Sequence, residues 1–141
     1  MHTTVPMLGP VIALVLWTFV MWAWMYATRI PAISAAKMRL DPNAPRGEQM
    51  NQLPPSVRWK ADNYNHLFEQ PTLFYAVALT LAILGDFSTV SLGLAWAYVA
   101  LRVVHSLWQA LVNVIVPRFV LFFVSSLVLL ALALRAALLA F

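Results

Sequence analysis

Long apolar runs separated by short polar segments dominate the chain. Four of these runs are long enough to cross a hydrocarbon core of roughly 30 Å at about 1.5 Å per helical residue. They cover residues 5–28, 57–84, 90–116 and 118–140. We therefore predict an all-α integral membrane protein, in which four transmembrane helices form one bundle and one domain over residues 1–141.

The segments that connect these runs differ in length. Residues 29–55 hold five of the nine prolines and mixed charge, which predicts one long loop with a short helix around 32–40. Residues 85–88 form a tight connection. Pro71 lies inside the second run, where it predicts a kink. Arg135 lies near the end of the last run, where its long side chain can reach the membrane interface.

Composition excludes several classes of protein. Of the residues, 62% are hydrophobic and only 10% are charged, whereas a water-soluble domain has about a quarter of its residues charged. The chain has no cysteine, which excludes a disulfide framework, a thiolate metal site and a cysteine nucleophile. Six of the nine basic residues lie between Arg29 and Lys60, so the charge indicates membrane topology. We expect no nucleic-acid partner and no metal site.

The distribution of charge also predicts an orientation. The first loop is basic and Arg118 opens the last span, whereas the loop between the second and third spans has no Lys or Arg. The positive-inside rule then places loops 1 and 3 in the cytoplasm and both termini in the periplasm. Short termini without a targeting signal predict a bacterial inner membrane.

Polar side chains follow one face of the second span and one face of the third. At about 100° per residue, the stripe on the second span stays within roughly 60°, with His66 at its edge, and consists of Arg58, Asp62, Asn65, His66 and Glu69. The stripe on the third span stays within roughly 80° and consists of Tyr98, Arg102, His105, Gln109 and Asn113. Two such stripes at matching depth predict a wet cleft that opens to the cytoplasm.

Glu69 and Arg102 lie deep on these stripes, both about 20 Å from the cytoplasmic ends of their helices. Neither charge is stable alone at that depth, so we predict that they pair, within one subunit or across a subunit boundary. One alternative is that the polar residues only hold the helices together. Another is a haem-binding membrane anchor, in which His66 and His105 ligate the iron.

Three segments of the chain resemble the MAPEG family, the membrane-associated proteins in eicosanoid and glutathione metabolism. They are residues 58–75, 95–106 and 113–118. The resemblance implies four-helix subunits that assemble as a homotrimer and bind glutathione between neighbouring subunits near the cytoplasmic face. It implies a glutathione-dependent transferase or peroxidase that acts on a lipophilic substrate. The alternative within the same fold is a protein that binds glutathione or a lipid without turnover.

The same resemblance implies two catalytic positions, Arg118 beside the glutathione thiolate and His105 on the wall of the cleft. The implied glutathione-binding residues are Arg58, Asp62, Asn65, His66, Glu69, Arg102 and Gln109. Two of them depart from the family pattern. His66 stands where the family has an asparagine three residues before the glutamate, and Gln109 stands where the eicosanoid enzymes have a tyrosine in the thiol pocket.

Overall fold

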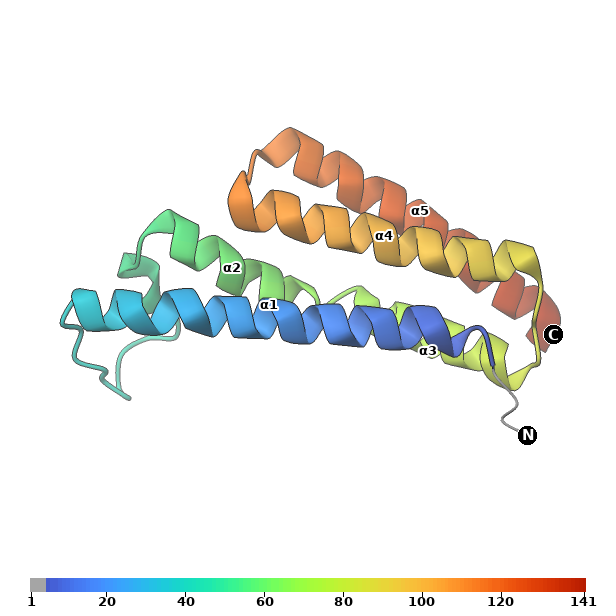
Figure 1. Cartoon of the computed structure of the whole chain (residues 1–141), viewed down its shortest axis with the longest axis horizontal. Helices are drawn as coiled ribbons and strands as arrows, with labels where there is room; N and C mark the ends of the chain where they lie inside the picture. Colours follow the sequence, from blue (N-terminus) through green and yellow to red (C-terminus); the bar gives the residue numbers. More distant parts are fainter. Residues whose placement is uncertain (1–4) are drawn as a thin grey trace.

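A computed structural model describes residues 5–141, and this part of the chain is helical without strands. Its elements are α1 (Leu8–Ala35), η1 (Met50–Gln52), α2 (Pro55–His66), α3 (Pro71–Ile83), α4 (Thr89–Leu111) and α5 (Ile115–Ala140). α1, α4 and α5 are each long and apolar enough to cross a membrane. α2 and α3 follow one another along α1 (Figure 1). The prediction of an all-α membrane fold is confirmed.

The second predicted span is interrupted, because α2 ends at His66 and α3 begins at Pro71. Proline has no N–H and fits the first turn of a helix, where that donor is not needed. Between the two helices the backbone closes tight turns, in which the N–H of Phe68 donates to the carbonyl of Asn65 at 3.0 Å and the N–H of Glu69 donates to that of His66 at 3.2 Å. The prediction of one kinked helix over residues 57–84 was therefore wrong. The segment 67–70 is a complete break.

The first helix is longer than the predicted span. It continues through Pro31 to Ala35, so the short helix expected around 32–40 is the end of α1. An interior proline removes one hydrogen bond, but the alanines and isoleucine around it keep the helical path. The helix ends at Ala35, and just beyond it Lys37 has a positive φ of 49° and donates its N–H to the carbonyl of Ser34 at 3.0 Å.

The loop after α1 is held by its own side chains. The Gln49 amide donates to the carbonyl of Arg39 at 2.7 Å, and its side-chain oxygen accepts the N–H of Asp41 at 3.0 Å. Gly47 takes a positive φ of 83° and accepts the N–H of Asn51 at 2.8 Å. These bonds replace regular secondary structure and give the proline-rich segment a defined path into α2.

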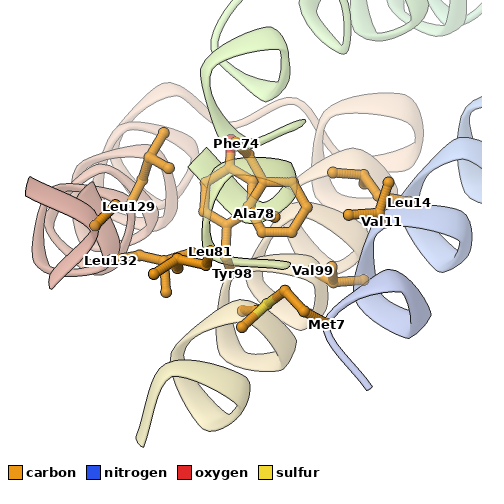
Figure 2. Close-up of a cluster of buried hydrophobic side chains, with 12 residues drawn as sticks. Met7, Val11, Leu14, Phe74, Ala78, Leu81, Tyr98, Val99, Leu129 and Leu132 are labelled. Carbon is orange, nitrogen blue, oxygen red and sulfur yellow. The ribbon is translucent and has the colours of Figure 1, made fainter. Parts of the chain in front are cut away.

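A buried apolar cluster joins α3, α4, α5 and the first half of α1 (Figure 2). At its centre Phe74 stacks on Tyr98, with ring centroids 4.6 Å apart and an interplanar angle of 18°. The other members are Met7, Val11, Leu14, Ala78, Leu81, Ala95, Val99, Leu129, Leu132 and Ala136. Apolar packing therefore closes the half of the bundle that contains α3, and the polar side chains gather in the half that contains α2.

Gln70 ties the break between α2 and α3 to the rest of the bundle. Its side-chain oxygen accepts the Tyr98 hydroxyl at 3.2 Å, and its amide donates to the Ser126 hydroxyl at 2.7 Å. One amide thus binds both α4 and α5. The break is therefore held in a fixed position, because both contacts act inside the bundle where a lost hydrogen bond is costly.

The far end of α5 is tied to the loop between α3 and α4. Arg135 Nε donates to the Ser91 hydroxyl at 2.6 Å, and Nη2 donates to that of Ser88 at 3.0 Å. Nη2 also lies 3.8 Å from a carboxylate oxygen of Asp86, which accepts the Ser91 hydroxyl. Arg135 thus reaches the loop at this end of the bundle, and its place at the membrane interface stays a prediction.

Candidate functional site

A polar cavity of about 480 Å³ lies between α2, α4 and α5. α2 packs against α1 and α4, whereas α5 packs against α4 and α3, so α2 and α5 leave a space between them. The lining residues come from α2, from the break at residues 67–70, from α4 and from the first turns of α5. They are Asp62, Asn65, His66, Glu69, His105, Gln109, Ile115, Arg118, Phe119 and Phe122. A cavity of this volume is within the usual range for small-molecule sites.

The structure brings together seven of the nine site residues that the sequence predicted. Those that line the cavity are Asp62, Asn65, His66, Glu69, His105, Gln109 and Arg118. Arg58 and Arg102 are not among the lining residues. One wall is formed by Ile115, Phe119 and Phe122, which were not predicted from the sequence. Their i, i+4, i+7 spacing was a usable signal, but it is hidden in a helix that is apolar on every face.

The predicted ion pair between Glu69 and Arg102 does not form within one chain. The structure, over residues 5–141, has no carboxylate within 4.0 Å of Arg102, whose side chain is fully buried. The guanidinium carbon lies 5.7 Å from the ring centroid of Phe122. The Glu69 side chain is 67% exposed. The pair within one chain fails because it was projected on a continuous helix, whereas the break after His66 turns Glu69 away from α4; a pair across a subunit boundary stays a prediction.

Glu69 pairs with His66 instead. The carboxylate Oε2 lies 2.8 Å from Nδ1 of the imidazole ring. The same ring packs against His105 and Phe122, with centroids 5.1 Å and 5.2 Å away. The two imidazole rings are adjacent and tilted by 38°, so no porphyrin fits between them. The prediction that these two histidines of one chain clasp a haem was therefore wrong.

Arg118 is oriented by the turn between α4 and α5. Its Nη1 donates to the side-chain oxygen of Asn113 at 2.6 Å. Asn113 has a positive φ of 54°, a conformation that asparagine tolerates better than most residues. The indole N–H of Trp108 donates to the carbonyl of Val114 at 3.2 Å and closes the turn. The α4 stripe therefore ends before Asn113, which contributes to the site from the turn.

The cavity combines charges of both signs with uncharged hydrogen-bonding groups. Asp62 and Glu69 carry carboxylates, and Arg118 carries a half-buried guanidinium. Buried Gln109 has a side-chain oxygen, and buried His105 a ring Nδ1, that contact no partner among the described residues. Within residues 5–141, no cluster of three or more His, Asp or Glu side chains could hold a metal ion. The arrangement suits a polar ligand with both cationic and anionic groups.

Membrane-crossing helices around a polar cavity define an integral membrane protein with a candidate ligand site inside the helical bundle. A model of the MAPEG family matches residues 7–138, nearly the whole chain. The chain therefore belongs to the MAPEG family, as the resemblance implied. Neither the comparison with curated proteins nor the comparison with solved structures found a match.

Proposed function

We propose that this protein is a membrane-bound transferase or peroxidase that uses glutathione and acts on a lipophilic substrate. The observation that carries the proposal is the polar cavity, in which a guanidinium, two carboxylates, two imidazoles and two amides line one space. Glutathione has two carboxylates, one ammonium and one thiol, so it needs partners of both charges. Membership of the MAPEG family supports the same class of ligand.

The charged groups of the cavity match those of glutathione. Arg118 stabilises the thiolate, because a guanidinium held by Asn113 presents a fixed positive charge. Asp62 or Glu69 receives the ammonium group. The Asn65 and Gln109 amides can each donate and accept hydrogen bonds with the peptide groups. Arg102 adds positive potential from behind the Phe122 ring.

We also propose that the working form is a homotrimer. Asp62 and Glu69 are exposed in a single chain, although they lie on α2 and the break after it, and α2 packs against the membrane-crossing helices α1 and α4. A carboxylate that faces lipid is costly, so this side of the cavity requires a cover other than lipid. A neighbouring subunit supplies that cover, in keeping with trimer formation in this family.

Calorimetric titration of the detergent-solubilised protein with reduced glutathione tests the proposal. We expect saturable heat in the wild type and at least tenfold weaker binding in Arg118→Ala, since a hydrogen bond to a charged group contributes about 1.5–3 kcal/mol. Arg39→Ala is the matched control, because Arg39 is exposed in the loop after α1. No heat at millimolar ligand would overturn the proposal. Binding without conjugation of any tested electrophile would leave a glutathione-binding protein without turnover.

A further inference from the structure

The pair formed by His66 and Glu69 has the geometry of an oriented base. An ionised carboxylate has no proton to donate, so Nδ1 of His66 must be the donor in the 2.8 Å contact with Glu69. In the neutral ring, Nε2 then carries the lone pair. The carboxylate therefore selects the tautomer in which the second ring nitrogen can accept a proton.

Packing fixes the His66 ring in the wall of the polar cavity. The side chain is only 22% exposed, and His105 and Phe122 pack against it. The neighbouring break is fixed as well, because Gln70 is bound to Tyr98 and Ser126. The imidazole is thus held at one position. A general base needs such a fixed position, because it must stay within hydrogen-bond reach of the proton that it takes.

Arg118, Gln109 and His105 do not offer the same chemistry. A guanidinium stays protonated and has no lone pair for a proton, so Arg118 can stabilise a thiolate but cannot receive the proton. Gln109 has an amide, which is not a base. Among the described cavity residues, His105 has no carboxylate partner for its ring Nδ1. The charged and titratable groups that face His66 are Asp62 and Glu69 from α2 and the break, Arg102 and His105 from α4, and Arg118 from α5.

We propose that His66 is the general base that takes the proton from the bound thiol, and that Glu69 is its positioning residue. This inference rests on the proposed function. The S–H bond breaks, the proton goes to Nε2, and the sulfur keeps the electron pair. With an activated alkene as the electrophile, that pair forms the S–C bond and the π electrons move into an enolate. His66 then returns the proton to the enolate carbon, so that one thiol and one alkene give one thioether.

Proton counting on binding gives the direct test. Titration with reduced glutathione in two buffers of different ionisation enthalpy measures the protons released, and ultraviolet absorbance measures the thiolate formed. In the wild type we expect thiolate without proton release, because the proton stays on His66. In His66→Asn, which installs the residue of the family pattern, each thiolate formed is expected to release one proton. Release of one proton per thiolate by the wild type would overturn the inference.

Conjugation kinetics supply an independent readout. His66→Asn is expected to lose roughly 10²-fold in rate at neutral pH and to recover as pH approaches the ordinary thiol pKa of about 8.5. Glu69→Gln is expected to change the pH–rate profile in the same direction but less, whereas Glu48→Gln, in the exposed loop, should leave it unchanged. Full binding with an unchanged profile in His66→Asn would contradict this inference alone. A wild type that does not bind glutathione would overturn the proposed function, and this inference with it.

Discussion

Single residues carry the expected chemistry of the cavity, and Arg118 is the clearest case. Its guanidinium lies at the start of α5, where a basic residue also contributes to membrane topology. Topology requires only a positive charge, whereas a thiolate clamp also requires the planar fork that Asn113 orients. A lysine at this position therefore separates the two roles.

We expect Arg118→Lys to keep expression and trimer formation, to lose most conjugation at neutral pH and to recover part of the rate as pH rises. A free thiol is only about 3% ionised at pH 7, so a glutathione transferase must lower the pKa of the bound thiol, and each pKa unit corresponds to about 1.4 kcal/mol. The measurement is the pH–rate profile of the variant in the same membranes. A profile identical to that of the wild type would limit Arg118 to topology.

The side-chain contact of Asn113 with Arg118 can be tested separately from the positive φ of its backbone. Asn113→Gly keeps the positive φ of 54° accessible but removes the side-chain oxygen that holds Arg118 at 2.6 Å. We expect roughly tenfold weaker conjugation at nearly unchanged thermal stability, measured as activity and melting temperature of the same sample. Asn113→Asp, which retains an acceptor, should keep more activity. Equal activity in all three proteins would contradict a role in orienting Arg118.

At the level of secondary-structure elements, two connections position the helices. The break of residues 67–70 places Glu69 beside His66 and is bound through Gln70 to α4 and α5. At the other end of the bundle, Arg135 of α5 binds the loop between α3 and α4. The first connection lies at the cavity, because Glu69 and His66 are among its lining residues.

The Arg135 connection predicts a measurable stability effect. Asp86→Asn is expected to lower stability by about 1–2 kcal/mol, because a partly exposed charged contact is removed. The measurement is the melting temperature in detergent, with Glu48→Gln as the control. Arg135→Ala should give a similar loss, and the double variant should lose less than the sum of the two. Fully additive losses would contradict direct coupling.

The same connection should make stability depend on pH. The Ser91 hydroxyl, and also Ser88 and the Arg135 charge, hold the pKa of Asp86 below its ordinary value. Because the folded-state pKa is lower than the unfolded value of about 3.9, this contribution is present above that value and is lost as pH falls through the folded pKa. We expect the wild type to lose more stability than Asp86→Asn on acidification below about pH 4. Parallel melting curves would contradict this expectation.

At the scale of the whole molecule, the loops between the helices lie at two opposite ends of the bundle. The basic loop after α1 and the turn between α4 and α5 lie at one end, and the α3–α4 loop and Phe141 lie at the other (Figure 1). A reporter fused after Phe141 should therefore be periplasmic, and one inserted at Gly47 cytoplasmic, because the positive charges of the loops are so one-sided. Reporter activity in intact bacterial cells measures this. The opposite pattern would place the cavity mouth away from cytoplasmic glutathione.

The sequence by itself determined the features that arise within one continuous helix. Apolar length predicted the membrane-crossing helices α1, α4 and α5. The 3.6-residue period placed Asp62, Asn65 and His66 on one face of α2 and His105 and Gln109 on one face of α4. These residues meet in the cavity because each stripe lies on an unbroken helix. The resemblance supplied Arg118, which periodicity alone did not assign to the site.

Only the tertiary structure decided the features that depend on where a helix stops and which helix lies beside it. Glu69 bonds to His66 because α2 ends there, and Arg102 is buried behind Phe122 because α5 packs along α4. Phe119 became a cavity residue because α5 stands away from α2. Helical periodicity is local, but these contacts depend on the relative placement of separate helices, which packing and the hydrogen bonds of the breaks and turns establish together.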